Sequence, residues 1–142
     1  MQVRELMSTE VVTVPADGTV GDAVDRLLDH GIGSVIVVDG DGNPAGIVTE
    51  SDVLRVARER GEPLGDIDVG AAGQSPVVTT TPSTAVATVA RLMAEEGVKK
   101  VPVLDGIDLV GILTLTDIVW QLPTLRRELA DAEGLREEWG PT

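Results

Sequence analysis

The sequence predicts a mixed α/β fold in which two β-α-β-β-α repeats pack about a pseudo-twofold axis. Three observations favour this fold. Short β-branched strands alternate with segments of helical periodicity, the same order of elements occurs twice, and the strand-to-helix corner at 46–52 recurs at 111–117. One such repeat has too little apolar surface to close its own core, whereas two copies can cover each other.

The first repeat is expected to contain a strand, a helix, a hairpin of two strands and a closing helix. Their expected ranges are 11–14, 19–30, 35–38, 45–49 and 51–58. Thr19 and Asp22 have the spacing of a capping box, and Gly31 follows the first helix where a left-handed cap is favoured. Pro15 is expected to end the first strand, and the turn 39–43 to join the hairpin.

The second repeat follows the same order, with elements expected at 77–80, 86–96, 101–104, 109–114 and 116–122. The predicted organisation is repeat one at 1–60, a charged linker with Gly and Pro at 61–72, repeat two at 73–122 and a C-terminal helical extension at 123–142. Apolar residues of that extension fall close to one helical face, which favours packing on a partner or on the pair itself. They are Leu125, Leu129, Ala132 and Trp139.

The two corners are the places where chemistry is expected. Each gathers free backbone N–H groups, two hydroxyl side chains and one carboxylate at the start of a helix. This set suits a sugar-phosphate better than a reacting carbonyl.

Composition excludes several classes of function. Apolar residues make up 42% of the 142 residues, but Phe and Tyr are absent and Trp120 and Trp139 are the only aromatic residues. Single-stranded nucleic acids are bound by exposed aromatic side chains in a positive groove, so the aromatic content and the net charge of −13 disfavour a nucleic-acid partner. The acidity indicates a strongly solvated surface or adaptation to high salt, which screens self-repulsion.

The sequence also bears on location. The chain has no cysteine, and therefore no disulfide framework, thiolate metal site or cysteine nucleophile. Residues 1–5 lack a basic segment followed by a long apolar run, and no later stretch is apolar enough to span a bilayer. We therefore expect a cytoplasmic protein with no membrane partner.

Several motifs together carry a resemblance to a known family. The first repeat has Val3-Arg4-Glu5-Leu6-Met7 before its first strand and Gly46-x-x-Thr49-x-x-Asp52 at its corner. The second has Gly97-Val98-Lys99-Lys100-Val101-Pro102-Val103 and Gly111-x-x-Thr114-x-x-Asp117. In this order the motifs resemble CBS domains, and two in tandem over residues 3–122 resemble a CBS pair, also called a Bateman module.

The resemblance implies a regulatory module that binds AMP, ADP, ATP or S-adenosylmethionine between the repeats, reports occupancy to a regulated protein, and forms a homodimer of four coplanar repeats. In the family, corner aspartates hold the ribose, neighbouring hydroxyl groups contact ribose or phosphate, a basic pair meets phosphates, and first-strand segments enclose the base. The corner aspartates correspond to Asp52 and Asp117, and the hydroxyl groups to Thr49, Ser51, Thr114 and Thr116. The basic pair corresponds to Lys99 and Lys100, and the first-strand positions to Thr13 and Thr79. Gly33, Ser34 and Pro102 complete the predicted set.

Two of these assignments have structural alternatives. Lys99 and Lys100 are the only lysines, and they either form a positive spot for a phosphate or lie in solvent at the carbonyl end of the preceding helix. Asp52 and Asp117 either serve a ligand or only stabilise a helix N-terminus. The presence of Thr-x-x-Asp in both copies favours the ligand site.

Metal binding and catalysis are disfavoured. Residues 39–50 imitate a calcium loop, but Pro44 stands where that loop requires glycine. His30 is the single histidine, and without cysteines it cannot assemble a metal site. No nucleophile or activated base accompanies the corner carboxylates, so we expect neither catalysis nor a cofactor. The alternative function is a ligand-independent dimerisation or scaffold module.

Overall fold

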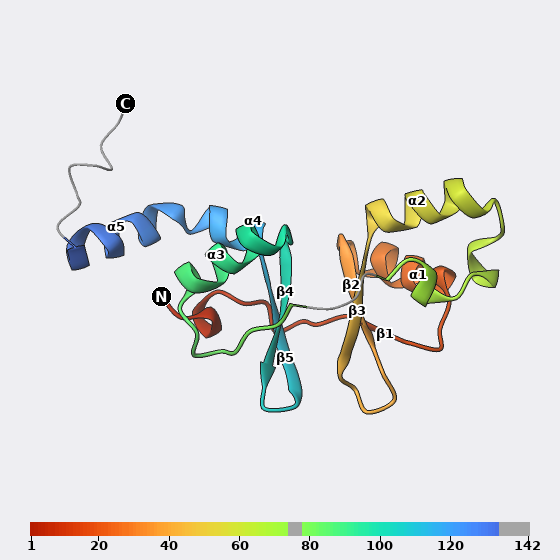
Figure 1. Cartoon of the computed structure of the whole chain (residues 1–142), viewed down its shortest axis with the longest axis horizontal. Coiled ribbons are helices and arrows are strands. Elements are labelled where there is room, and N and C mark those ends of the chain that lie inside the picture. Colours follow the sequence, from red (N-terminus) through yellow and green to blue (C-terminus); the bar gives the residue numbers. More distant parts are fainter. Residues whose placement is uncertain (74–77, 134–142) are drawn as a thin grey trace.

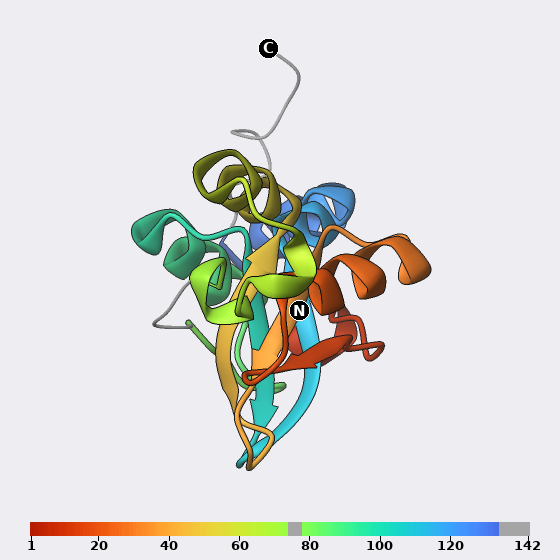
Figure 2. The same cartoon turned by 90° about the vertical axis from the view of Figure 1, so that its right-hand side faces the viewer.

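The computed structural model of the chain describes residues 1–73 and 78–133. Figure 1 shows two hairpins side by side, with the helices gathered toward the ends opposite the hairpin turns, and the view in Figure 2 agrees. The first half contains η1 (Val3–Glu5), β1 (Thr13–Pro15), α1 (Val20–His30), β2 (Ser34–Val38), β3 (Pro44–Thr49) and α2 (Glu50–Arg60). The predicted mixed α/β fold is confirmed.

The second half begins with two short 3-10 helices and repeats the helix–hairpin–helix order, but the described residues contain no strand corresponding to β1, and a further helix follows. Its elements are η2 (Leu64–Asp66), η3 (Val69–Ala71), α3 (Val86–Glu96), β4 (Lys100–Asp105), β5 (Asp108–Thr114), α4 (Leu115–Trp120) and α5 (Leu122–Glu133). The predicted helix at 86–96 matches α3. The predicted helix at 116–122 is shorter in the structure, because α4 ends at Trp120 and α5 begins at Leu122.

The sheets are small and built around the two hairpins. In the first, β1 runs parallel to β2, and β2 pairs antiparallel with β3; in the second, β4 pairs antiparallel with β5. β1 includes Pro15, one residue beyond the expected end. β1 is an edge strand, and an edge strand tolerates proline at a position whose N–H would face away from the neighbouring strand. Of the predicted strand at 77–80, Thr80 forms a single parallel bridge with Val103, and Val77 lies outside the described residues.

The predicted helix caps are present. The Asp22 N–H donates to the Thr19 hydroxyl over 3.1 Å, and the Thr19 N–H donates to the Asp22 carboxylate over 2.9 Å. Gly31 ends α1 with a φ of 60°, a left-handed conformation that glycine adopts without steric cost. Of the extension residues, Leu125 packs against the second core, whereas the side chains of Leu129 and Ala132, and all of Trp139, lie outside the described part.

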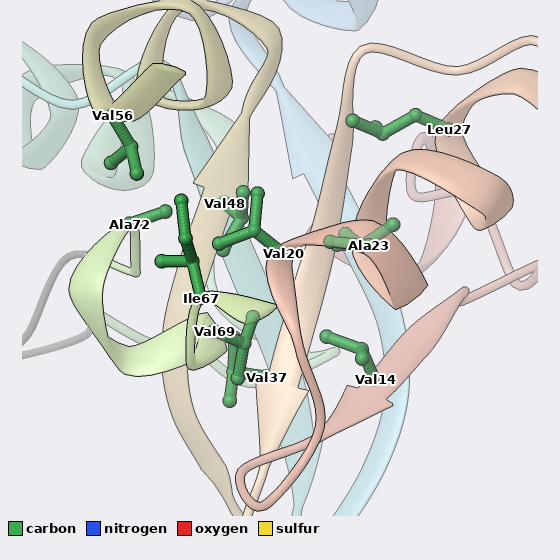
Figure 3. Close-up of a cluster of buried hydrophobic side chains, with 11 residues drawn as sticks. Val14, Val20, Ala23, Leu27, Val37, Val48, Val56, Ile67, Val69 and Ala72 are labelled. Carbon is green, nitrogen blue, oxygen red and sulfur yellow. The ribbon is translucent and has the colours of Figure 1, made fainter. Parts of the chain in front are cut away.

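Each repeat has its own aliphatic core, and each core is completed by a segment that precedes the other repeat. Figure 3 shows the first core, in which Ile67, Val69 and Ala72 from the predicted linker pack beside Val20 and Val48. Val3, from the start of the chain, is buried in the second core. In Figure 1 the N-terminal segment accordingly lies beside α3 before the chain crosses to β1.

Backbone hydrogen bonds fix this exchange of leading segments. The Val20 N–H donates to the Ile67 carbonyl over 2.8 Å, which ties the segment at 64–73 to the first repeat. On the other side, Ser8 and Ile112 exchange two bonds of 2.9 Å, which ties the segment at 1–8 to β5. Each bond pairs backbone groups that would otherwise be buried without a partner, so each leading segment is held to the repeat whose core it completes.

Gly111 permits the close approach of the N-terminal segment to β5. A Cβ atom at this position would lie 2.7 Å from the Met7 Sδ and 2.9 Å from the Ser8 carbonyl oxygen. Gly111→Ala is therefore expected to lower the free energy of unfolding by about 1–3 kcal/mol through overpacking, measured by urea denaturation. Gly40→Ala is the control, because nothing lies within 4 Å of its Cβ position. Equal stability of the two variants would contradict the account of this contact.

Candidate functional site

A pocket of about 470 Å³ lies between the two repeats. Its first wall is the corner of repeat one, and its second wall is the segment that enters β4 of repeat two. The lining residues are Gly33, Ile47, Thr49, Glu50, Ser51, Asp52, Val78, Gly97, Val98, Lys99 and Lys100. The pocket therefore combines the carboxylate corner of one repeat with the lysine pair of the other.

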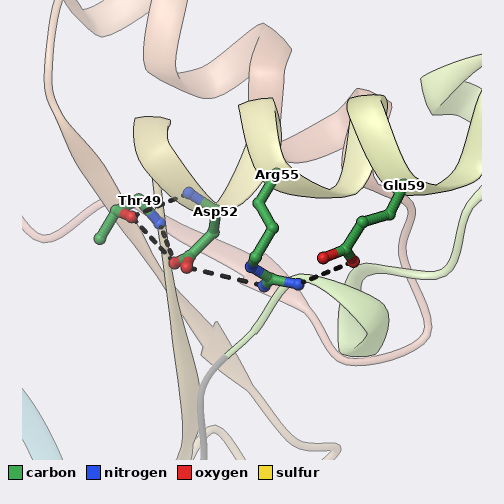
Figure 4. A network of polar contacts seen from close by, with 4 residues as sticks. All are labelled: Thr49, Asp52, Arg55 and Glu59. Carbon is green, nitrogen blue, oxygen red and sulfur yellow. Dashed lines mark hydrogen bonds and ion pairs between the residues drawn. The ribbon is translucent and has the colours of Figure 1, made fainter.

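Thr49 and Asp52 are held at the first wall by the junction of β3 and α2. The Asp52 N–H donates to the Thr49 hydroxyl over 3.2 Å, while the Thr49 N–H and hydroxyl donate to Asp52 Oδ2 over 2.8 and 2.9 Å. Figure 4 shows this capping box, which fixes the carboxylate of Asp52 at the helix start. Asp52 is only 4% exposed, so its carboxylate is firmly placed rather than mobile in solvent.

A short chain of charges continues along α2. Arg55 Nη2 lies 3.8 Å from Asp52 Oδ1, and Arg55 Nη1 lies 3.4 Å from Glu59 Oε2 (Figure 4). Arg55 is 40% exposed in its side chain, so the ion pairs add little stability. In the site, Arg55 places a positive charge near Asp52 Oδ1, whereas the capping bonds are made by Asp52 Oδ2.

The same capping geometry occurs at the second corner and once more outside both corners. The Thr114 N–H donates to Asp117 Oδ2 over 3.0 Å, and the Asp117 N–H donates to the Thr114 hydroxyl over 3.1 Å. Thr19 and Asp22 form the third box. A Thr-x-x-Asp motif therefore marks the start of a helix in this chain, and only its place in the fold can make it part of a site.

The second wall is cationic. Lys100 begins β4 and is half-buried, and Lys99 beside it is exposed. A Cβ atom added to Gly33 would lie 3.3 Å from Lys100 Nζ and 3.5 Å from Glu50 Oε1, so both charged groups face the same point. Burial lowers the pKa of Lys100 below its ordinary value of 10.5; the negative charges of Glu50 and Asp52 oppose this shift, and Lys99 adds to it.

Six of the thirteen residues predicted for the site line this pocket together. They are Gly33, Thr49, Ser51, Asp52, Lys99 and Lys100. The others lie elsewhere: Thr13 in β1, Ser34 opposite Thr49, Thr79 exposed before the second sheet, Pro102 buried opposite Ile112, and Thr114, Thr116 and Asp117 at the second corner. Ligand binding by any of the thirteen stays a prediction.

Sequence reasoning missed five lining residues: Ile47, Glu50, Val78, Gly97 and Val98. Glu50 sits inside the quoted corner motif at a position without a specified residue type. Gly97 and Val98 precede the lysine pair. Gly97 is the left-handed C-cap of α3, and a cap glycine does not by itself indicate a ligand site. Ile47 and Val78 belong to apolar runs that were assigned to strands, and Ile47 does lie in β3.

Two further searches concern only residues 1–73 and 78–133. In these ranges no three His, Cys, Asp or Glu side chains gather as a metal site would require. Nor does any helix there combine the length and hydropathy needed to cross a bilayer.

Comparison with known proteins identifies the family. The family model "CBS domain" matches residues 3–59 and again residues 68–123. The chain therefore belongs to the CBS-domain family and contains a tandem pair of these domains, which confirms the resemblance found in the sequence.

Solved structures agree with this assignment. The CBS-domain containing protein ATU1752 from Agrobacterium tumefaciens is 30% identical, with a TM-score of 0.75 over 84% of this chain and 97% of that one. A putative signal-transduction protein with CBS domains from Burkholderia ambifaria is 30% identical, with a TM-score of 0.78 over 86% and 93%. The CBS domain pair of protein MJ0100, in complex with 5′-methylthioadenosine and S-adenosyl-L-methionine, is 25% identical, with a TM-score of 0.77 over 87% and 97%.

Among curated relatives, the uncharacterized protein MJ1404 of Methanocaldococcus jannaschii is 32% identical over 139 residues, which are 89% of this chain and 33% of that protein. The uncharacterized protein MK0525 of Methanopyrus kandleri is 29% identical, over 88% of this chain and 64% of its own length. The chain thus spans from about a third to under two thirds of the length of these relatives.

The lowered pKa of Lys100 is directly measurable, because the chain contains only two lysines. Lys100 is expected to titrate below 10.5, followed through its side-chain NMR signals with a Lys99→Arg variant for assignment. In the unfolded chain the lysine keeps its proton to higher pH, so the free energy of unfolding should rise with pH between the lowered pKa and 10.5. Titration at or above 10.5 would contradict the burial of the ammonium group.

Proposed function

We propose that this CBS pair is a regulatory module that binds an adenosine-containing ligand in the pocket between its repeats. The observation that carries the proposal is the meeting of the Asp52 corner with Lys99 and Lys100 in one pocket. The bound 5′-methylthioadenosine and S-adenosyl-L-methionine of the MJ0100 pair support it, since the two folds superpose with a TM-score of 0.77.

The lining residues divide into groups that fit the parts of such a ligand. Asp52 presents a fixed carboxylate to the ribose hydroxyls, and Ser51 adds an exposed hydroxyl group beside it. Ile47, Val78 and Val98 supply apolar surface for the base. Lys99 and Lys100 provide ammonium donors for a charged group attached at the 5′ position.

Regulation follows from the division of the pocket between two repeats. A ligand that contacts both walls favours the arrangement of the repeats in which the walls are correctly spaced. A protein partner that distinguishes this arrangement then responds to ligand concentration, with a coupling free energy set by the difference in affinity. The proposal includes a cytoplasmic location and assigns the site neither catalysis nor a cofactor.

Ligand binding is expected to depend on the first corner more than on the second. Calorimetric titrations with AMP, ADP, ATP, S-adenosylmethionine and adenosine should give binding, and Asp52→Asn should weaken adenosine by about tenfold or more, the value of a hydrogen bond to a charged group. Asp117→Asn is the matched control, because Asp117 forms an equivalent capping box at the start of α4 but is not among the residues that line the pocket. Replacing both lysines with alanine should weaken AMP and spare adenosine.

The result that would sink the proposal is an absence of heat for all five ligands with correctly folded protein. The alternative of a ligand-independent scaffold would then remain, and the next search would be for a protein partner. If Asp52→Asn and Asp117→Asn lowered the affinity for adenosine equally, the first corner would have no special role, and the assignment of the ligand to this pocket would be wrong.

We also propose that the pair forms a homodimer through apolar helix faces. Leu54 on α2 is 72% exposed and Trp120 on α4 is 79% exposed, and Figure 1 shows both helices on the same side of the molecule, beyond the ends of the hairpins. A second copy that covers this face would bury apolar side chains now in water.

The dimer is tested by sedimentation equilibrium. Trp120→Glu is expected to raise the dimer dissociation constant by at least tenfold, because it removes buried apolar area and adds a charge at the interface. Ile107→Glu is the control, since Ile107 is 80% exposed but lies in the β4–β5 turn at the opposite end. A wild-type chain that sediments as a monomer would contradict the proposal.

A further inference from the structure

Glu50 sets the pocket apart from a simple phosphate site. Its carboxylate and the Lys100 ammonium group approach the same point above Gly33, at 3.5 and 3.3 Å from the position of an added Cβ atom. Burial is the larger effect on the pKa of Lys100 and lowers it, while the negative charge of Glu50 acts in the opposite direction. The part of the pocket around Gly33 therefore presents both signs of charge.

This pair of charges belongs to the first corner alone. The Glu50 N–H donates to the Gly33 carbonyl over 3.2 Å, and in the second repeat the Leu115 N–H donates to the Lys99 carbonyl over 2.8 Å, so Leu115 is the counterpart of Glu50. Thr49 pairs with Ser34, and Thr114 pairs with Lys100, so Ser34 is the counterpart of Lys100.

The two positions thus change together between the repeats. One corner combines Glu50 of its own repeat with Lys100 of the other, and by the same symmetry the second corner combines Leu115 with Ser34. If Lys100 served only a phosphate, the glutamate beside it would oppose that role. The start of α2 favours a carboxylate at this position without requiring one, because Leu115 occupies the same position at the start of α4. A ligand that needs both charges accounts for both residues.

The balance of charge in the pocket leads to the same conclusion. The charged lining residues are Glu50, Asp52, Lys99 and Lys100, two of each sign. A triphosphate carries several negative charges, which the exposed carboxylate of Glu50 would repel at close range. An amino-acid group carries one ammonium and one carboxylate, and it can replace the attraction between Glu50 and Lys100 with two ion pairs at no change in net charge.

We propose that the pocket selects an adenosyl ligand whose 5′ substituent ends in a zwitterionic amino-acid group, over an adenosine polyphosphate. Glu50 accepts hydrogen bonds from the ligand's ammonium group, and Lys100 donates to its carboxylate. Gly33 lets the two charged groups lie close to the backbone at this point, because an added Cβ atom would lie only 3.3 Å from Lys100 Nζ. This inference rests on the proposed function, since it names the ligand class for the same pocket.

The experiment measures dissociation constants by calorimetry for four probes. S-adenosylmethionine and S-adenosylhomocysteine carry the amino-acid group, 5′-methylthioadenosine lacks it, and ATP carries a triphosphate in its place. The wild-type protein is expected to bind S-adenosylhomocysteine at least tenfold more tightly than ATP. Using both amino-acid ligands separates recognition of this group from any effect of the sulfonium charge, which only S-adenosylmethionine has.

Two variants should change the probes in different directions. Glu50→Gln is expected to weaken S-adenosylhomocysteine about tenfold, strengthen ATP and leave 5′-methylthioadenosine unchanged. Lys100→Gln should weaken both S-adenosylhomocysteine and ATP. Glu59→Gln is the matched control, because Glu59 lies on the same helix, carries the same charge and is absent from the pocket lining; it should change no probe.

Opposite outcomes overturn different claims. If 5′-methylthioadenosine binds but ATP is tighter than S-adenosylhomocysteine, or if Glu50→Gln weakens both equally, the selection of an amino-acid group is wrong while the adenosyl pocket stands. If none of the four probes binds to protein whose thermal unfolding is normal, both the proposed function and this inference fail.

Discussion

The exchange of leading segments between the repeats is the constraint on which the rest of the structure depends. Val3 is buried in the second core, and Ile67, Val69 and Ala72 are buried in the first, so each core includes residues from a segment that leads into the other repeat. The hydrogen bonds between Ser8 and Ile112 add backbone pairing to this hydrophobic contact. Because the exchange runs in both directions, each core contains a segment that continues into the other repeat, and the two walls of the pocket come from the repeats joined in this way.

One local motif both starts a helix and lines the pocket. The capping box of Thr49 and Asp52 satisfies donors at the start of α2, and this use alone would justify both residues. The box formed by Thr19 and Asp22 shows that the chain uses the same device where it does not line the pocket. What differs at the first corner is the long-range neighbour, since Lys100 of the other repeat faces it.

The sequence predicted the elements well where a local interaction determines them. Thr19 with Asp22 and the left-handed Gly31 define the two ends of α1, and both signals act within a few residues of each end. The leading segments were not predicted, because the linker at 61–72 is rich in charge, Gly and Pro and its three buried apolar residues have no periodic neighbours. Their burial depends on contacts with a repeat that lies far away in the chain, which local patterns do not encode.

The candidate site shows the same limit. Both halves of the pocket were recognised from the resemblance, and the lysine pair was seen to occur in one repeat only, but the Thr-x-x-Asp motif is the same at both corners and does not tell them apart. The structure distinguishes them through residues that are unremarkable by themselves: Glu50 was an unspecified position in its motif, and its meaning depends on Lys100 across the pocket. A pairing of this kind between distant residues has no signature in one sequence without its fold.

The division of the pocket also limits which ligands can act as signals. A molecule that touches only lining residues of the first repeat, such as Ile47 and Asp52, binds both arrangements of the repeats equally, and such binding shifts no equilibrium however tight it is. A molecule that also engages Lys100 gains free energy only when the second wall is in place. In the proposed function the base already contacts Val78 and Val98 of the second wall, and the group attached at the 5′ position adds Lys100 to these contacts. Both parts of the ligand would then contribute to the difference in affinity that regulation requires.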